Sequence, residues 1–411
     1  MKSGISALLL LLLVALPAVS ATLPGFRVER LGDTEGFPSS IAIDSRGNIY
    51  YTVTGGTIYR FFGSGSTAVA TVPTDMGGNS GLLGMALLDD RTAVVHYTTP
   101  LQTHDVVSTI DLRNGSETVL QRFVADIESP GRQSPSEHHG GNPTVAADGS
   151  IFIGIGDYSW HLIAPDPAWN GGKIFRISRD GLVTQYARGL RNPFDMAWDP
   201  ERKRLIVADN GPTGGDEINI IRDNMDLGWP HTYGTLPPVA GATPPDYVFP
   251  MTVAPTGMVL LNDANPYLRD GFLLGAFVTR AIYFFGDTAP PIAPPHVLVE
   301  KETAQVIDVA QRSDGAIFFA TGGFSAGTTA IWRLHGPVRG DCDGDGDVDA
   351  ADRDALTREL GDGSMQPTRR VHEGAHRSSW GCDADLDGFV TAADAVEMLR
   401  IDGWRRRAVR R

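Results

Sequence analysis

The chain has 411 residues, a formal net charge of −14 and a hydrophobic content of 42%. A surface this acidic disfavours nucleic acid as a partner, because phosphate binding needs clustered cations. Its 48 glycines and 27 prolines indicate many turns and short strands rather than long helices. We therefore expect a soluble globular protein that is rich in β structure.

The N-terminus has the layout of a secretory signal peptide. Lys2 precedes an apolar run from Ala7 to Leu16, and Val19-Ser20-Ala21 offers small residues at a cleavage site. The apolar run is shorter than the roughly 20 residues of a membrane-spanning helix. We expect cleavage after Ala21, export to the periplasm or the extracellular space, and no membrane span.

One pattern recurs six times between residues 22 and 337: two stretches of alternating apolar residues flank a polar turn. This pattern is typical of β-hairpins. The six hairpins begin at Ser40, Leu83, Pro143, Phe194, Thr256 and Ile307. Their recurrence predicts an all-β, six-bladed β-propeller at 22–337, with one sheet for each repeat. A β-sandwich or a pair of β domains is the alternative, but neither requires the same hairpin six times.

Two acidic loops follow, and they begin at Asp341 and Asp383. Each has acids at positions 1, 3, 5 and 12 and glycine at position 6, with a backbone carbonyl expected to bind at position 7, which is the ligand pattern of a Ca²⁺-binding EF-hand loop. The expected ligands are Asp341, Asp343, Asp345, Asp347 and Asp352 in the first loop and Asp383, Asp385, Asp387, Phe389 and Asp394 in the second. A bound Ca²⁺ would cancel the repulsion between these carboxylates. An acidic, disordered segment is the alternative.

A helical stretch follows each loop, at 351–360 and at 392–401. In the second stretch, an apolar face is expected at Ala392, Ala395, Val396 and Leu399. Residues 338–404 are therefore expected to form a small α-helical calcium-binding domain. The basic tail at 405–411 is expected to be solvated and disordered, with contact to an anionic surface as the alternative.

The two cysteines of the chain, Cys342 and Cys382, lie at the mouths of the two acidic loops. In an exported protein, two cysteines can form one disulfide bond. We expect a bond that holds the two loop entrances together, with two free or partly buried thiols as the alternative.

Neither loop follows a sequence suited to an entering helix: "GPVRG" precedes the first loop and "SSWG" the second. A calcium loop with one exiting helix, duplicated, resembles a type I dockerin module, and the resemblance covers about 340–403. It implies docking on a cohesin-type scaffold or a cell-surface partner. The segment between the repeats is longer than is usual in dockerins, and alanines occupy loop positions 10 and 11.

Four polar motifs stand out within the propeller region. They are "EHHGGN" from Glu137, "GLRNPFDMAWDP" from Gly189, "DNGPTGGDEINII" from Asp209 running into "NMDLGWP", and "APTGM" from Ala254. In this order and spacing, residues 26–334 resemble the soluble quinoprotein sugar dehydrogenases, the glucose/sorbosone dehydrogenase family that uses pyrroloquinoline quinone (PQQ).

This resemblance implies oxidation of a small-molecule sugar, an aldose, at its anomeric carbon. His138 matches the family's general base, a role that suits histidine because its pKa lies near working pH. Arg191 and Asn192 match residues that face the quinone, where Arg191 would stabilise negative charge on the reduced cofactor. The carbonyls of Gly211 and Pro212 match the ligands of a Ca²⁺ that touches PQQ. Asp216 and Glu217 are expected to support this loop or to bind a further calcium ion.

These residues also have purely structural interpretations. His138 could form hydrogen bonds within its loop, Arg191 could connect neighbouring blades, and the loop at Gly211 could be an ordinary turn.

The family's cationic grip on the three carboxylates of PQQ is largely absent from the sequence. Val278 occupies the position of a lysine, Gln305 and Ile307 the positions of two arginines, and Phe194 that of a glutamine. Buried carboxylates without cationic partners are costly, although Arg280, two residues after Val278, could compensate in part as a cofactor-binding residue. Two functions therefore remain: a PQQ-dependent aldose dehydrogenase, and a non-catalytic propeller that binds a carbohydrate or a protein.

Overall fold

The structure is a computed structural model that describes residues 23–63, 65–125, 137–323, 325, 327–361 and 379–408, without the side chains of 402–408. The expected signal peptide and the last three residues of the basic tail lie outside these ranges. Within the described ranges, no helix is long and apolar enough to cross a membrane.

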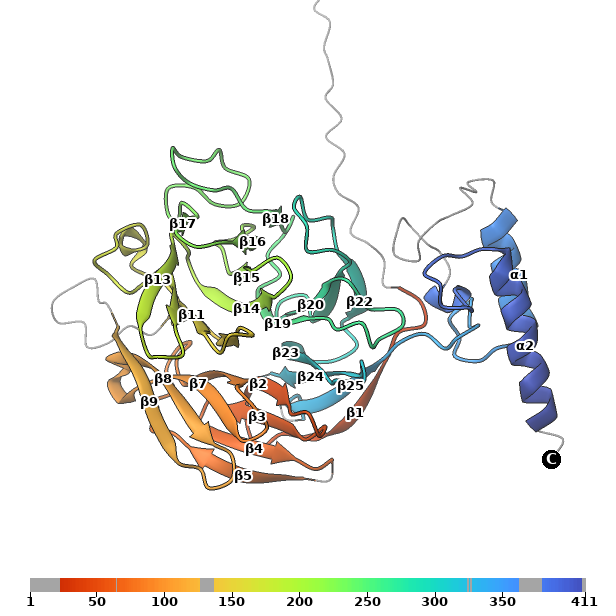
Figure 1. Ribbon diagram of the computed structural model, residues 1–411, viewed down its shortest axis with the longest axis horizontal. Coiled ribbons are helices and arrows are strands. Elements are labelled where there is room, and N and C mark those ends of the chain that lie inside the picture. Colours follow the sequence, from red (N-terminus) through yellow and green to blue (C-terminus); the bar gives the residue numbers. More distant parts are fainter. Residues whose placement is uncertain are drawn as a thin grey trace, which may run out of the picture.

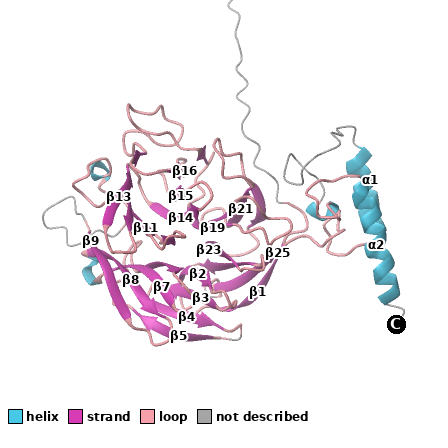
Figure 2. Cartoon of the chain, in the orientation of Figure 1, coloured by secondary structure: helices cyan, strands magenta, loops and turns pink. Residues whose placement is uncertain are grey.

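Six sheets are arranged radially around one axis (Figures 1 and 2), which confirms the predicted six-bladed propeller. The first blade contains β2 (Pro38–Ile43), β3 (Ile49–Val53), β4 (Thr57–Phe61) and β5 (Ser66–Thr71). The second contains β6 (Leu82–Leu87), β7 (Thr92–Thr98), β8 (His104–Asp111) and β9 (Glu117–Val124). The third contains β10 (Thr144–Val145), β11 (Ile151–Ile155), β12 (Lys173–Ile177) and β13 (Val183–Arg188), with β17 (Met225–Asp226) added in parallel.

The fourth blade contains β14 (Pro193–Asp199), β15 (Arg204–Asp209), β16 (Glu217–Ile221) and β18 (Tyr247–Val248). The fifth contains β19 (Pro255–Leu260), β20 (Phe272–Ala276), β21 (Ala281–Phe285) and β22 (His296–Glu300). The sixth contains β23 (Gln305–Gln311), β24 (Ile317–Gly322), β25 (Ala330–His335) and the N-terminal strand β1 (Arg27–Asp33). The six predicted hairpins are the pairs of innermost strands of the six blades.

The ring closes through the sixth blade, because β1 pairs with β25 in the antiparallel register Arg27–His335 to Asp33–Ala330. The first and last strands of the propeller therefore lie in one sheet, and separating them would open the ring. Within the blades, strands such as β15 are buried at every residue, because neighbouring blades cover both faces of the sheet. This explains why several strands are continuous apolar runs rather than strict alternations.

Buried carboxylates connect neighbouring blades. The inner strands β14 and β23 have bulges next to Asp195 and Asp308, and a bulge re-aims the side chain at that point. The Oδ2 of Asp308 accepts hydrogen bonds from Ser40 Oγ at 2.9 Å and from the Ile41 amide at 2.8 Å, both in the first blade. The Oδ2 of Asp195 accepts one at 2.6 Å from the Met258 amide in the fifth blade.

The C-terminal region forms two helices, α1 (Ala350–Gly361) and α2 (Ala392–Ala408), which lie beside the propeller in Figure 1. Cys342 and Cys382 form a disulfide bond in the core between them. The predicted apolar face of α2 is partly wrong: Met398 is buried, whereas Val396 is 53% and Leu399 61% exposed. Helix α2 also continues to Ala408, so the start of the expected disordered tail is helical.

The C-terminal region packs directly against the propeller. Trp380, which is 1% exposed, contacts the rings of Phe26, Phe284 and His296 at centroid distances of 5.7, 5.7 and 5.4 Å. Leu386 of the second acidic loop packs against the same cluster, and its carbonyl accepts a hydrogen bond from Arg269 at 3.3 Å. The two parts of the chain therefore share one apolar core at this contact.

Replacing Trp380 with alanine is expected to lower the free energy of unfolding by about 3–5 kcal/mol, because the buried ring would leave a cavity. Urea denaturation followed by circular dichroism measures this change. Trp169→Ala is the matched control, since Trp169 is 38% exposed. Equal, small losses for the two variants would contradict a stabilising contact between the C-terminal region and the propeller.

Candidate active site

The polar motifs meet at one face of the propeller. His138 precedes β10, Arg191 precedes β14, and Ala254 precedes β19, while Gly211 follows β15. The inner strands begin at this face and the strands paired with them end there, so all four loops emerge on the same side. The structure therefore brings together the residues that the sequence placed in four separate motifs.

His138 is held by a buried carboxylate. Its Nδ1 lies 2.6 Å from Oδ1 of Asp157, whose side chain is fully buried. A carboxylate can only accept, so Nδ1 carries the hydrogen and Nε2 keeps a lone pair that can take a proton. His138 also has a positive φ of 56°, which is unfavourable for a residue with a Cβ.

Asp157 connects His138 to two further rings. Its Oδ2 lies 2.6 Å from His161 Nδ1 and accepts a hydrogen bond from Trp229 Nε1 at 2.8 Å. Burial raises the pKa of Asp157, but the hydrogen bond and charge of His138, with the bonds from His161 and Trp229, outweigh burial and lower that pKa overall. Asp157 is thus stabilised as the carboxylate that orients His138.

Arg191 lies beside this group, with its guanidinium 5.8 Å from the centre of the Trp229 ring. Its Nη1 donates to the carbonyls of Asn210 at 2.9 Å and Gly211 at 3.0 Å. Its Nε is buried and has no hydrogen-bond partner in the described part of the chain. A buried donor without an acceptor is costly, so this atom indicates that a ligand with an acceptor group binds here.

Asn192 and Asp209 position the same loop. The Asn192 Oδ1 accepts from the Gly140 amide at 3.0 Å and so holds the loop of His138. Asp209 accepts from the amides of Arg191 at 3.0 Å and Asn192 at 2.7 Å. Burial, together with the charge of Glu217, raises the pKa of Asp209 to about 8 even though the two amides favour its ionised form.

Asp216 supports the loop that carries Gly211 and Pro212. Its Oδ1 accepts from the Gly211 amide at 3.1 Å, and its Oδ2 from the amides of Val253 at 2.7 Å and Ala254 at 2.8 Å. The Pro212 carbonyl accepts from the Gly215 amide at 2.8 Å. The carbonyls of Gly211 and Pro212 each keep a second lone pair that could bind a cation.

The site offers more to the reacting end of PQQ than to its carboxylates. His138 and the orphaned Nε of Arg191 suit a quinone and its substrate. At the predicted carboxylate-binding positions, Val278 is 56% exposed and Ile307 is 4% exposed within the propeller. Arg280, in the β20–β21 turn on the same face, is half-buried, and no described residue pairs with its guanidinium. Arg191 and Arg280 are therefore the two cations of this face that could meet a ligand such as PQQ.

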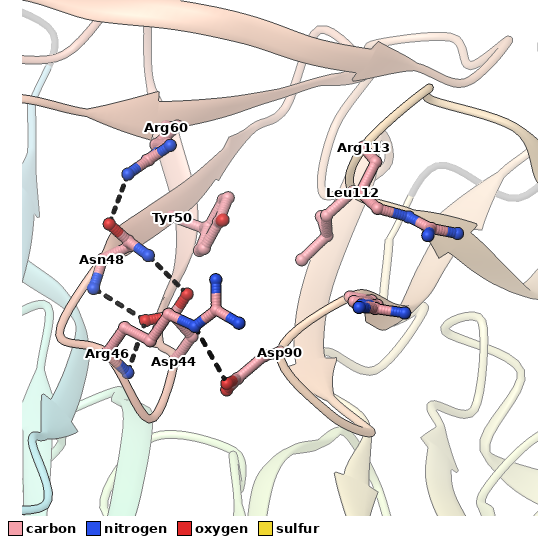
Figure 3. Close-up of a pocket in the computed structure, with 9 residues that line it drawn as sticks. Asp44, Arg46, Asn48, Tyr50, Arg60, Asp90, Leu112 and Arg113 are labelled. Carbon is pink, nitrogen blue, oxygen red and sulfur yellow. Dashed lines mark hydrogen bonds and ion pairs between the residues drawn. The ribbon is translucent and has the colours of Figure 1, made fainter.

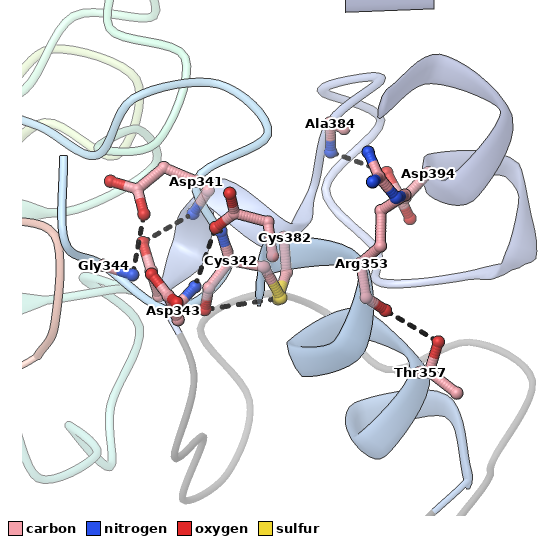
Figure 4. The surroundings of a disulfide bond; sticks show 12 residues. Asp341, Cys342, Asp343, Gly344, Arg353, Thr357, Cys382, Ala384 and Asp394 are labelled. Atoms are coloured by element: carbon pink, nitrogen blue, oxygen red, sulfur yellow. Dashed lines mark hydrogen bonds between the residues drawn. A yellow bond between two sulfur atoms is a disulfide. The ribbon is translucent and has the colours of Figure 1, made fainter. Parts of the chain in front are cut away.

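The acidic loops form a second candidate site (Figure 4). Ligand atoms of Asp341, Asp343 and Asp352 lie within 4.8 Å of one another, as do those of Asp347, Asp349 and Asp352, and those of Asp383, Asp385 and Asp394. Asp345 and Asp387 are not among these groups, which cover only the described residues. The expected ligands thus converge in part. In each loop, the acids at positions 1, 3 and 12 come together.

The two loops share most of their internal hydrogen bonds. The acid at position 12, Asp352 or Asp394, accepts from the amides at positions 2 and 3 at 2.7–3.2 Å. Burial, and to a smaller extent the charge of the neighbouring carboxylates, raises the pKa of Asp383 to about 7. Burial likewise raises the pKa of Asp341 and Asp394. The amides therefore do not offset the crowding of negative charge, and a divalent cation would.

Sequence reasoning missed Asp157, Asp209 and Trp229 as parts of the site. Asp157 and Asp209 each lie at or just after the end of a buried strand, β11 and β15. An acid at that position, on the face where the motif loops emerge, is the signal that could have identified both. Trp229 lay within a quoted motif, but nothing in the sequence indicated its bond to Asp157.

Replacing Asp157 with asparagine is expected to lower the free energy of unfolding by about 2–3 kcal/mol at pH 7, because it removes charged hydrogen bonds. The lowered pKa of Asp157 means that this stability is present above its unfolded value of 3.8 and is lost as the pH falls through the folded value. Urea denaturation at pH 7 and pH 3 should show the difference from wild type shrinking in acid.

Asp263→Asn, at an exposed carboxyl, is the control for Asp157→Asn. A difference between Asp157→Asn and wild type that grows in acid would contradict the assigned role of Asp157.

Comparison with known proteins identifies the family of the propeller region. A family model described as Glucose / Sorbosone dehydrogenase matches residues 37–329. The aldose sugar dehydrogenase YliI of Escherichia coli K12 is 25% identical over 229 residues, which are 48% of this chain and 62% of that protein. Quinoprotein glucose dehydrogenase B of Acinetobacter calcoaceticus is 26% identical over 209 residues, 40% of this chain and 43% of that protein. The chain thus spans about half the length of the curated relatives it matches.

Among solved structures, the PQQ-bound aldose sugar dehydrogenase of Streptomyces coelicolor superposes with a TM-score of 0.65 at 20% identity, over 76% of this chain and 99% of that one. This likeness shows the shared fold. The family model spans more than half of the chain and includes each propeller residue of the site, so the chain belongs to the glucose/sorbosone dehydrogenase family.

Proposed function

We propose that this protein is a secreted, PQQ-dependent aldose sugar dehydrogenase. The observation that carries the proposal is the network at one face of the propeller. Asp157 orients His138 at 2.6 Å and binds Trp229, over which Arg191 lies with a buried, unpaired Nε. A base with a free Nε2 and an unsatisfied cationic donor are the groups that oxidation of a sugar hydroxyl requires.

In this mechanism, His138 Nε2 accepts the proton of the anomeric hydroxyl as the hydrogen on C1 leaves with its electron pair, so that the aldose becomes a lactone. Bound PQQ supplies the two-electron acceptor for that hydride. Asp157 stabilises the imidazolium that forms on His138. Arg191 donates its free Nε to an oxygen that gains negative charge.

The remaining residues would hold the cofactor. The Nδ2 of Asn192 has no partner within the described ranges and would face a quinone oxygen. Arg280 would pair with a carboxylate of PQQ. The carbonyls of Gly211 and Pro212 would bind the Ca²⁺ that contacts the cofactor.

The second candidate function is a non-catalytic propeller that binds a carbohydrate or a protein. It is favoured by Val278, Gln305 and Ile307, which offer no positive charge where the family presents cations. A single charged hydrogen bond contributes about 1.5–3 kcal/mol, so the loss of three could weaken PQQ binding by orders of magnitude. The two functions therefore differ in whether PQQ binds at micromolar concentration.

Titration of the purified protein with PQQ and Ca²⁺ distinguishes them. The dehydrogenase is expected to change the absorbance of micromolar PQQ and to reduce a dye with aldoses. His138→Gln should lower kcat by about 10²–10⁴-fold, because it removes the general base, while PQQ still binds. His335→Gln, at the end of β25 on the opposite face, is the control. No spectral change at micromolar PQQ would exclude the dehydrogenase and leave the binding propeller.

We further propose that the C-terminal loops bind Ca²⁺ and that the module attaches the exported enzyme to an extracellular partner. Support for calcium comes from the shared ligand pattern, the converging carboxylates and their unbalanced charge. Support for a cohesin-type partner is the dockerin-like order of loop and helix. Support for export is the signal-peptide pattern at 1–21 together with the disulfide.

Removing calcium from the full chain is expected to lower its melting temperature, because a ligand held at 100 times its Kd stabilises by about 2.7 kcal/mol for each site. Differential scanning calorimetry with Ca²⁺, with a chelator, and with Mg²⁺ measures the shift. Asp383→Asn should abolish part of it, and the exposed control Asp263→Asn should not. If the melting temperature of the wild type did not change when Ca²⁺ is added, calcium binding by these loops would be refuted.

A further inference from the structure

A polar pocket lies on the face of the propeller opposite to the candidate active site. It has a volume of about 580 Å³, which is within the range of small-molecule sites. Its walls come from the β2–β3, β6–β7 and β8–β9 turns and from β4 (Figure 3), at the ends of the inner strands far from His138. The residues that line it are Asp44, Arg46, Asn48, Tyr50, Arg60, Asp90, Arg91, Leu112 and Arg113.

Four arginines and two aspartates line this pocket in a protein of net charge −14. Asp44 is bound by its own turn, and Asp90 by the neighbouring β2–β3 turn. Asp44 accepts from the amides of Arg46 at 3.0 Å and Asn48 at 2.8 Å. Asp90 accepts from the amide and hydroxyl of Ser45 at 2.9 and 2.6 Å, and is 3.7 Å from Arg46. The four guanidinium groups outnumber these two carboxylates, and Asp111 outside the pocket pairs with Arg113, so the lining residues keep an excess of positive charge.

Several guanidinium donors are uncommitted. Arg91 is exposed, and among the described residues its guanidinium forms no hydrogen bond or close ion pair, although its charge acts on Asp111. The Nε of Arg60 is buried and unpaired within the same ranges, although its Nη2 donates to Asn48 Oδ1. Arg113 is paired with Asp111. Figure 3 shows Arg46 and Arg60 on one side of the pocket and Arg113 on the other.

We propose that this pocket binds a small ligand with an oxyanion group, of the carboxylate or phosphate class. Guanidinium forks match the geometry of both groups. Tyr50, which is 6% exposed at the pocket wall, and Leu112 add an aromatic ring and an aliphatic side chain that a sugar ring can cover. An acidic sugar therefore satisfies the pocket better than a neutral one. The proposal is independent of the activity at His138, because the two sites lie on opposite faces.

The test is isothermal titration calorimetry of the full chain with methyl β-glucuronide, methyl β-glucoside and inorganic phosphate at constant ionic strength. Both glycosides lack a free anomeric hydroxyl, so neither is a substrate for oxidation by His138. We expect saturable binding of the glucuronide, binding of the glucoside at least tenfold weaker, and affinity that falls as salt rises. If phosphate bound as tightly as the glucuronide, the oxyanion that the pocket recognises would be a phosphate group rather than a carboxylate.

Arg91→Gln is expected to weaken binding about tenfold, because one charged hydrogen bond is lost. Arg179→Gln is the matched control, since Arg179 is exposed at the β12–β13 turn of the next blade, on the same face and outside the pocket. Equal weakening by both variants would show only a general effect of charge and overturn the proposal. Absence of saturable binding of either anion to the wild type would also overturn it.

Discussion

Buried carboxylates that accept backbone amides determine the shape of the candidate active site. Asp157 orients His138, Asp209 holds the amides of Arg191 and Asn192, and Asp216 holds those of Gly211, Val253 and Ala254. Each acid lies at or beside the end of a strand and binds a loop that would otherwise have many conformations. Ordering such loops costs about 1–2 kcal/mol for each residue, and hydrogen bonds to acids that lie at the ends of rigid strands help to fix them.

The partners of each acid decide its charge. Asp157 is bound by two imidazoles and an indole, and its pKa is lowered despite burial. Asp195 has only neutral donors and lies near Asp308, so burial and that carboxylate raise its pKa. In the C-terminal loops, several acids share a few amides, and the excess negative charge remains. The same kind of hydrogen bond therefore leaves a satisfied carboxylate in the propeller and, in the C-terminal module, acids that we propose bind a cation.

The sequence predicted what depends on local patterns. Six hairpins, both acidic loops and the cysteines are visible as short periodic or spaced motifs, and the motif resemblance singled out His138 and Arg191, whose roles remain predictions. Contacts between distant segments were not visible. Trp380 preceded an acidic loop without any sign that it would pack on Phe26 and Phe284. Helix α2 buries Met398 rather than Val396 because the disulfide core and α1 set its rotation.

Positive backbone φ values occur at the candidate site and also in turns elsewhere, such as those of Lys203 and Asp270. His138, Ala254 and Arg280 have positive φ values of 56°, 50° and 53°, and each such residue costs on the order of 1 kcal/mol or more. Arg191 adds a buried donor without an acceptor. By contrast, Ile307, which stands where the family has an arginine, is buried and packs within the propeller. The buried donor of Arg191 is therefore the feature of this face that a purely structural role leaves unexplained and that a ligand with an acceptor group would satisfy.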